Sequence, residues 1–285
     1  PDVRLNEPLL YRSSFYNQAL QRAMIYLSKG DDRTFAFSTP RLPREDAYEL
    51  NKPFTDAVYD FLSELRVFPK ERCHVYEMLG AGDKDRELVD SFLENADDSM
   101  RFSPPNPEGK TRWKYFGHAC VLVEAPSGRN VLVDPLLSNQ SSEDPPRFSI
   151  EDLPERVDLV VLTHNHADHV VLETLLSIRH RIGQIVVPKS GGSLVDPSLK
   201  LMLNAIGFKD VVEVDYLTSI AESDLTVTAL PFLGEHGDLD IRSKAAWLVS
   251  SGESKILFAA DSNNLDPRMY DLIKQAYGQI DILFL

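Results

Sequence analysis

The sequence has very few cysteines, only Cys73 and Cys120 among 285 residues. Two thiols cannot build the disulfide framework of a small secreted domain, and neither lies in the Cys-x-x-Cys spacing of a zinc ligand pair. We therefore expect two buried thiols in a protein of the reducing cytoplasm. We also expect no secretory leader, because the start at Pro1 has no basic segment followed by an apolar run.

Long hydrophobic runs and positive charge are scarce as well. No stretch approaches the roughly 18–20 uncharged apolar residues that a membrane-spanning helix needs, so we expect no membrane segment. The 30 Lys and Arg against 44 Asp and Glu give a net charge of −14. Because binding to phosphate backbones relies on Lys and Arg, this balance argues against a nucleic-acid partner. Hydrophobic residues, at 43%, suffice for a globular core.

A proline-rich segment divides the sequence. Three prolines and a glycine fall within residues 103–109, and such a segment cannot lie inside a helix or a central strand. We predict an N-terminal domain at residues 1–102, a linker at 103–111 and a catalytic domain at 112–285. Helical spacing of apolar residues predicts a mainly helical N-terminal domain, with helices at residues 15–27, 54–65 and 86–93.

The catalytic domain alternates between the two kinds of element, which predicts a layered α/β fold. Hydrophobic runs predict strands at residues 119–124, 131–134, 158–163, 184–187, 211–214, 225–230, 246–250, 256–260 and 281–285. Helical patterns lie at residues 170–181, 197–206 and 267–277. Since the chain ends inside the last predicted strand at Leu285, we expect this domain to be truncated at its C-terminus.

The densest cluster of metal-binding side chains directly follows the buried strand at 158–163. It contains His164, His166, Asp168 and His169, and so holds three of the seven histidines in the chain. In an extended run the first two histidines lie on one side and can hold one ion. The turn into the next helix brings the other two side chains toward a second ion. Three imidazoles and a carboxylate suit a borderline divalent metal.

This His-x-His-x-Asp-His motif resembles the signature of the metallo-β-lactamase superfamily. Residues 115–124 and 131–135 resemble the opening hairpin of that superfamily. The resemblance implies an αββα sandwich with two metal ions at one edge. It also implies that Asp134 steadies the ligand loop through hydrogen bonds, although a turn residue before Pro135 is an equally good interpretation. A bridging carboxylate is expected at a strand end, and Asp261 fits. A final histidine ligand would lie beyond this chain.

One further ligand position is contested by Glu235 and His236, and the sequence chemistry alone does not decide between them. With His236 the site is rich in nitrogen, which suits zinc and the hydrolysis of an ester, lactone or amide. With Glu235 the site gains a third carboxylate, which shifts the preference toward iron or manganese.

A closer resemblance decides in favour of Glu235. Residues 163–169, 232–239 and 258–262 together resemble the di-iron β-hydroxylase family of chloramphenicol biosynthesis. The resemblance implies that Glu235 binds iron while His236 is a supporting residue near the metals. It implies no catalytic residue beyond the metal ligands. Two iron ions and dioxygen would hydroxylate the β-carbon of an amino acid held as a thioester on a carrier domain of a nonribosomal peptide synthetase.

The same resemblance implies an external electron donor and a role for the N-terminal domain in dimerisation or substrate docking, so a homodimer is possible. A zinc-dependent hydrolase of the same fold is the alternative function. Carrier domains are usually acidic, as is this chain, so docking requires a local basic surface. The candidates are residues 179–181 and the pair Arg242 and Lys244, although an ordinary solvated face is the commoner role for such clusters.

Overall fold

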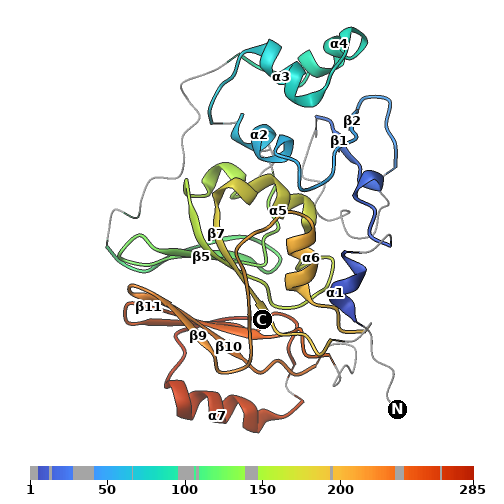
Figure 1. Ribbon diagram of the computed structural model, residues 1–285. Helices are drawn as coiled ribbons and strands as arrows, with labels where there is room; N and C mark the ends of the chain where they lie inside the picture. Colours follow the sequence, from blue (N-terminus) through green and yellow to red (C-terminus); the bar gives the residue numbers. More distant parts are fainter. Residues whose placement is uncertain are drawn as a thin grey trace.

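The computed structural model of the chain describes residues 6–12, 15–27, 42–65, 67–95, 106, 109–138, 147–192, 195–234, 241–263 and 265–285. Two β-sheets lie face to face in the middle of the molecule, and helices cover the outer face of each (Figure 1). This is the four-layered αββα sandwich that the sequence predicts. Among the described residues, no helix is long and apolar enough to cross a membrane.

The first sheet has six strands in the order β3-β4-β5-β6-β7-β8. The three strands on one side of it are antiparallel, whereas β5 to β8 run parallel. Every residue of β4 and β5 is buried, because both faces of these central strands are covered. The strands are β3 (Arg112–Gly117), β4 (Cys120–Glu124), β5 (Asn130–Val133), β6 (Val157–Val161), β7 (Ile182–Pro188) and β8 (Val211–Val214).

The second sheet has five strands in the order β13-β12-β11-β10-β9. Its pairings are antiparallel except for the parallel pair of β12 and β13. The strands are β9 (Ser219–Glu222), β10 (Leu225–Leu230), β11 (Ala246–Ser251), β12 (Ser254–Phe258) and β13 (Ile282–Phe284). Of these, β9 has no counterpart among the predicted strands, because it is half-exposed and lacks a hydrophobic run.

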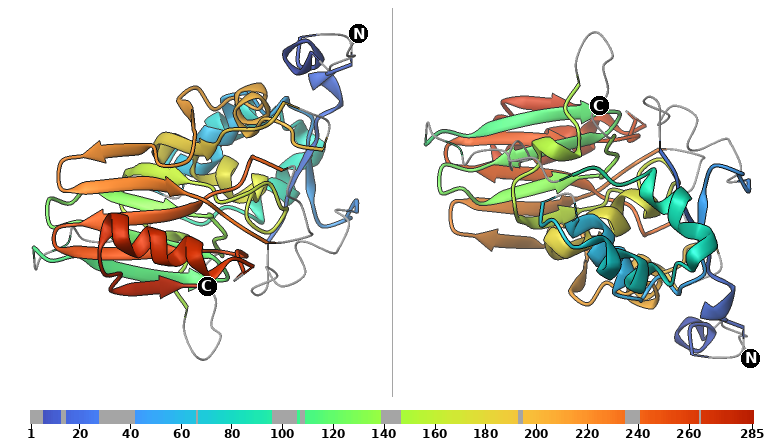
Figure 2. Two further views of the ribbon diagram at one scale, coloured as in Figure 1. Left: turned by 90° about the horizontal axis from the view of Figure 1, so that it is seen from below. Right: turned by 90° about the horizontal axis from the view of Figure 1, so that it is seen from above.

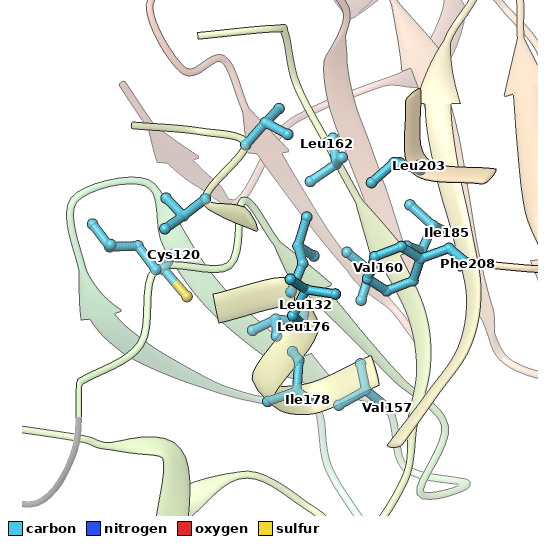
Figure 3. Packing of buried hydrophobic residues seen from close by; sticks show 14 of the residues in the cluster. Cys120, Leu132, Val157, Val160, Leu162, Leu176, Ile178, Ile185, Leu203 and Phe208 are labelled. Carbon is cyan, nitrogen blue, oxygen red and sulfur yellow. The ribbon is translucent and has the colours of Figure 1, made fainter. Parts of the chain in front are cut away.

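Three hydrophobic clusters hold these layers together. The cluster between the two sheets includes Trp247 and Phe258. A second cluster packs the six-stranded sheet against α5 (Leu172–Ile178) and α6 (Leu199–Ala205), and Figure 3 shows its strand residues facing its helix residues. A third packs the five-stranded sheet against α7 (Pro267–Tyr277), which covers its outer face in Figure 1.

The N-terminal residues form a separate small core around Leu50, Val58 and Val75. In the right-hand view of Figure 2, α2 lies over the helices of the six-stranded sheet, where it packs on α5. The N-terminal elements are α1 (Glu7–Leu10), β1 (Ala23–Ile25), β2 (Tyr48–Leu50), α2 (Val58–Glu64), α3 (Arg72–Leu79) and α4 (Arg86–Asp90). Short 3-10 helices are η1 (Gln18–Leu20), η3 (Asp83–Asp85), η4 (Ile150–Asp152) and η5 (Arg179–Arg181).

Two of the sequence predictions for this region are wrong. Residues 15–27 do not form one helix; they contain η1 followed by β1, which pairs with β2. Cys73 is exposed rather than buried, whereas Cys120 is fully buried as predicted. Most of the proline-rich linker lies outside the described residues.

Candidate metal centre

The His-x-His-x-Asp-His motif lies in the loop that follows β6, at the edge where the two sheets meet. The start of β11 holds this loop from the opposite sheet: the backbone N–H of Ala245 donates to the carbonyl of Thr163 over 2.8 Å. The indole N–H of Trp247 donates to the carbonyl of Leu162 over 2.9 Å. His164 also forms an isolated antiparallel bridge with Lys244. The motif is therefore fixed to both sheets.

Two groups of donor atoms come together at this edge. In the first, one donor atom each from His164, His166 and Asp261 lie within 4.8 Å of one another. Nε2 of His164 and Nδ1 of His166 are 2.8 Å apart, and Nε2 of His164 is 3.6 Å from Oδ2 of Asp261. Donors that each lie about 2.1 Å from an ion at right angles are about 3 Å apart, so these separations fit one shared ion.

The second group consists of His118, Asp168 and His169, whose donor atoms also lie within 4.8 Å of one another. Nε2 of His169 is 3.7 Å from Oδ2 of Asp168. The same nitrogen is 3.4 Å from Oδ2 of Asp261, which belongs to the first group. Oδ2 of Asp261 thus lies within 4 Å of an imidazole nitrogen from each donor group.

Asp134 and Thr163 orient the two buried histidines of the site. The Asp134 carboxylate accepts hydrogen bonds from the Thr163 backbone N–H (2.7 Å) and hydroxyl (2.6 Å), and from Nδ1 of His169 (2.7 Å). Nδ1 of His164 lies 3.0 Å from the Thr163 hydroxyl. Since both Nδ1 atoms are held in this way, the Nε2 atoms of both rings face Asp261.

The electrostatics around His169 are dominated by carboxylates. Burial alone lowers the pKa of His169, but the hydrogen bond and charge of Asp134 and the charges of Asp261 and Asp168 outweigh it and raise that pKa above its ordinary value. Three carboxylates directed at one buried ring make a site that attracts positive charge. A divalent cation bound at this place would be stabilised by the same three negative charges.

An unsatisfied buried atom tests whether the site suits a metal. Nε2 of His169 is buried and has no hydrogen-bond partner among the residues that the structure describes. A buried ring nitrogen without a partner is costly to leave as it is. Its lone pair faces the carboxylates of Asp168 and Asp261, so an ion between them would complete its coordination. The donor set of imidazoles and carboxylates matches zinc, iron or manganese.

Backbone strain is concentrated around this site. Five described residues other than glycine have a positive φ, and three of them are His118 (52°), Asp134 (39°) and Ala260 (47°). The left-handed region costs a residue with a Cβ roughly 1–2 kcal/mol. All three lie at the ends of strands beside the donor groups. Such local strain is typical of positions that are held for function by the surrounding structure.

The structure brings together five of the six predicted metal ligands: His164, His166, Asp168, His169 and Asp261. Their binding of a metal remains a prediction. The sixth, Glu235, and the supporting residue His236 lie outside the described residues. The segment leading to them is described: the Asn263 backbone N–H donates to the Leu233 carbonyl over 2.7 Å. Glu235 therefore follows a segment that is bonded close to Asp261.

Two residues at the site were missed by the sequence reasoning. His118 belongs to the second donor group, and Thr163 carries the hydroxyl that orients the histidines. The signal for His118 was present in the Gly117-His118-Ala119 segment of the opening hairpin. Its position 50 residues from Asp168 concealed the contact.

The two candidate basic surfaces are wrong as surfaces for docking. Arg179 is buried by its ion pair with Asp60, and Arg181 is only 7% exposed. Lys244 is equally buried, and its ammonium group donates to the carbonyl of Gly234. The exposed Arg242 is paired with the carboxylate of Asp215. Neither cluster offers a group of solvated positive charges.

Comparisons with known proteins agree with this geometry. Residues 1–96 match the family model described as the diiron non-heme beta-hydroxylase N-terminal domain, and residues 129–285 match that of the beta-lactamase superfamily domain. The 4-amino-L-phenylalanyl-[CmlP-peptidyl-carrier-protein] 3-hydroxylase of Streptomyces venezuelae is 40% identical over 295 aligned residues, which cover all of this chain and 54% of that relative.

The same agreement holds for solved structures. The crystal structure of CmlA, a diiron beta-hydroxylase from Streptomyces venezuelae, superimposes with a TM-score of 0.87 at 39% identity, covering 100% of this chain and 53% of that one. A more distant similarity, 28% over 192 residues, links 63% of the chain to 65% of a UPF0173 metal-dependent hydrolase of Anaeromyxobacter sp.. The chain spans about half the length of the hydroxylase that it matches throughout.

Proposed function

The chain belongs to the beta-lactamase superfamily and carries the N-terminal domain of the diiron non-heme beta-hydroxylases, and from this premise we propose that it is a non-haem di-iron monooxygenase. It hydroxylates the β-carbon of an aminoacyl group that is tethered as a thioester to a carrier domain of a nonribosomal peptide synthetase. The observation that carries the proposal is the pair of donor groups that meet at Asp261. The 40% identity to a carrier-protein 3-hydroxylase over the whole chain supports the substrate class.

In this proposal each donor group holds one iron ion. His164 and His166 would hold the first, Asp168 and His169 would hold the second, and Asp261 lies near both groups. Glu235 would complete the ligand set. The Nδ1 contacts of His164 and His169 support this assignment, because they direct the Nε2 atom of each ring to the metal side. His236 is a supporting residue beside Glu235.

When bound, two ferrous ions supply electrons and a site for activating dioxygen, which is chemistry that protein side chains lack. The reaction converts a C–H bond into C–OH, and the second oxygen atom leaves as water after two electrons and two protons are added. An external electron donor supplies those electrons. No side chain is required as a general base. The protein holds the ligands rigidly and places the β-carbon beside them.

The other parts of the proposal concern organisation. We place the N-terminal domain at residues 1–102, the linker at 103–111 and the catalytic domain at 112–285. The N-terminal domain serves dimerisation or docking of the carrier domain, and the enzyme acts in the cytoplasm. The chain has only two cysteines, Cys73 and Cys120, and so few thiols suit a reducing compartment.

A zinc-dependent hydrolase is the second candidate, and one observation favours it. Four of the six described donor residues are histidines, namely His118, His164, His166 and His169. A nitrogen-rich set suits zinc, which would activate water for hydrolysis of an ester, lactone or amide. The similarity to metal-dependent hydrolases points the same way.

Metal analysis of protein purified without added metal separates the two candidates. The hydroxylase is expected to hold two irons per chain with visible absorption, and to hydroxylate the carrier thioester much faster than the free amino acid. Two colourless zinc ions, or equal turnover of thioester and free amino acid, would refute the proposal.

Paired variants test the contested ligand position. Glu235→Ala is expected to remove or scramble iron, because it deletes a proposed ligand. His236→Ala is the matched control and is expected to retain most of the iron. The reverse pattern would assign the position to His236 and support the zinc hydrolase.

A further inference from the structure

His118 is the one member of the two donor groups that neither the sequence motifs nor the proposed function uses. It lies in the turn between β3 and β4, and its Nε2 atom is 3.0 Å from Oδ2 of Asp168. Its ring centroid is 4.9 Å from that of His169. His118 therefore contacts the carboxylate and packs beside the imidazole that together form the second metal position.

We propose that His118 is a positioning residue that fixes the Asp168 carboxylate for the second iron by donating its Nε2–H to Oδ2. This inference rests on the proposed di-iron centre. Asp168 needs such a partner because its side chain is 32% exposed, whereas the His169 side chain is fully buried. A carboxylate at the solvent edge can rotate about its side-chain bonds. A hydrogen bond from a fixed donor restricts it to one orientation.

The backbone conformation at His118 supports a functional role for its side chain. Gly117 pairs with Cys120, so His118 and Ala119 form the two-residue turn of the hairpin. His118 has a φ of 52°, a conformation that glycine or asparagine adopts with less strain. Asparagine and glycine are the residues that such two-residue hairpin turns prefer. The hydrogen bond to Asp168 offers a reason for the presence of a histidine.

The turn is rigid enough to position a ligand. Its flanking residues Phe116 and Cys120 are 1% and 0% exposed, and both belong to the core beneath the six-stranded sheet. The backbone on each side of His118 is therefore fixed by packing. A well-packed hairpin therefore holds the His118 imidazole beside Asp168.

Direct metal binding by His118 is the competing role. The three donor atoms of the group lie close enough for it. However, Nε2 makes a hydrogen bond of ordinary length to Oδ2 of Asp168, so its in-plane direction is aimed at the carboxylate. The geometry favours donation to the carboxylate, and the stoichiometry of bound iron distinguishes the two roles.

The experiment titrates the metal-free protein with ferrous iron under anaerobic conditions and records the stoichiometry, the two dissociation constants and the Mössbauer spectrum. The variants are His118→Gly, His118→Asn and His118→Gln. Glycine and asparagine suit the positive φ, so both variants are expected to melt no lower than the wild type in the metal-free state. Neither reaches Asp168. Glutamine carries an amide N–H on a longer side chain.

For His118→Gly and His118→Asn we expect two irons at saturation, with the weaker dissociation constant raised about 10- to 100-fold and the signal of one iron altered. His118→Gln is expected to restore part of the affinity. Loss of one whole iron at saturation would make His118 a ligand and overturn the proposal. Variants with the affinity and spectrum of the wild type would also overturn this proposal. In that case, two irons bound by the wild-type protein would leave the proposed function standing. A wild-type protein that binds none would refute both.

Discussion

At the scale of single residues, Asp134 holds the loop that carries the predicted metal ligands. Its carboxylate accepts from both the N–H and the hydroxyl of Thr163 and from Nδ1 of His169. Asp134→Asn keeps the shape but replaces one acceptor oxygen with an NH₂ group, which opposes one of these donors. We expect the metal affinity to fall about 10- to 100-fold. Competition with a chromophoric chelator measures it.

The variant Thr163→Val tests the same hydrogen-bond network in a second way. It removes the hydroxyl that contacts Asp134 and His164 but retains the backbone N–H bond to Asp134. A smaller loss of affinity than in Asp134→Asn is expected. Wild-type metal affinity in both variants would show that these contacts do not orient the ligands.

His180 gives a residue-scale prediction about pH. Burial, assisted by the charge of Arg181, lowers its pKa from 6.5 to about 4. Between those values the unfolded chain binds a proton that the folded chain does not, so stability falls as the pH decreases from 6.5 to 4, and this contribution changes no further below 4. The full shift corresponds to about 3 kcal/mol, and partial exposure of the ring reduces it to roughly 1–2 kcal/mol.

The variant His180→Gln removes this titration. Its free energy of unfolding, measured with urea at pH 7 and pH 4.5, is expected to fall less on acidification than that of the wild type. His74→Gln is the matched control, because the His74 side chain is 47% exposed. An equal decrease in the free energy of unfolding on acidification in His180→Gln and the wild type would contradict the prediction.

The residues of the site differ in how readily the sequence predicts them. His164, His166, Asp168 and His169 fall within six positions after a buried strand, so local spacing alone brings them together. Asp261 is predicted through the resemblance to the metallo-β-lactamase superfamily, which implies a carboxylate at a strand end. His118 depends on the packing of a hairpin against a distant loop, and no local pattern encodes that contact.

At the scale of elements, the end of α5 joins the N-terminal elements to the sandwich. The Arg179 guanidinium donates two 2.9 Å hydrogen bonds to the Asp60 carboxylate on α2. It also donates to the carbonyls of Phe54, Asp56 and Ile206. Because the Arg179 side chain is only 8% exposed, Arg179→Ala leaves several acceptors unpaired. We expect a loss of about 3 kcal/mol in the free energy of unfolding.

Urea denaturation measures this loss, and two variants calibrate it. Arg179→Lys keeps the charge but not the planar fork of donors, so its stability should lie between those of the wild type and Arg179→Ala. Arg268→Ala breaks an exposed ion pair with Asp266 and should leave stability unchanged. If the free energy of unfolding of Arg179→Ala equals that of the wild type, the contacts of Arg179 contribute nothing to stability.

Elements of the sandwich were more predictable than those of the N-terminal region. The predicted bounds of β8, β10 and α7 are those observed, because hydrophobic runs and an Asp-Pro helix start mark them locally. Residues 15–27 have helical spacing, yet the hydroxyl of Tyr16 bonds to the carbonyl of Ala205 and β1 pairs with β2. Tertiary contacts override the local pattern there.

At the scale of the whole molecule, the net charge of −14 bears on substrate docking. Neither predicted basic cluster offers a group of solvated positive charges, so under the proposed function an acidic carrier domain would meet repulsion rather than attraction. Raising the ionic strength to about 150 mM shortens the Debye length to roughly 8 Å and weakens this repulsion. The KM for the carrier-tethered substrate is therefore expected to fall as salt is added.

Steady-state kinetics from about 20 to 150 mM salt measure this trend, and the free amino acid is the control because it carries no carrier surface. A KM that rises with salt for the carrier substrate alone would reveal an attractive basic patch. It would then have to be sought among residues other than Arg179, Arg181, Arg242 and Lys244.

The division of the donors between two sheets has a consequence for maturation. His164 and Asp168 follow β6, whereas Asp261 follows β12 almost a hundred positions later, and the two strands belong to different layers. No partial product that contains only one layer can chelate a pair of ions with a shared carboxylate. At the proposed site, capture of two ions that share Asp261 would therefore require both sheets to be in place.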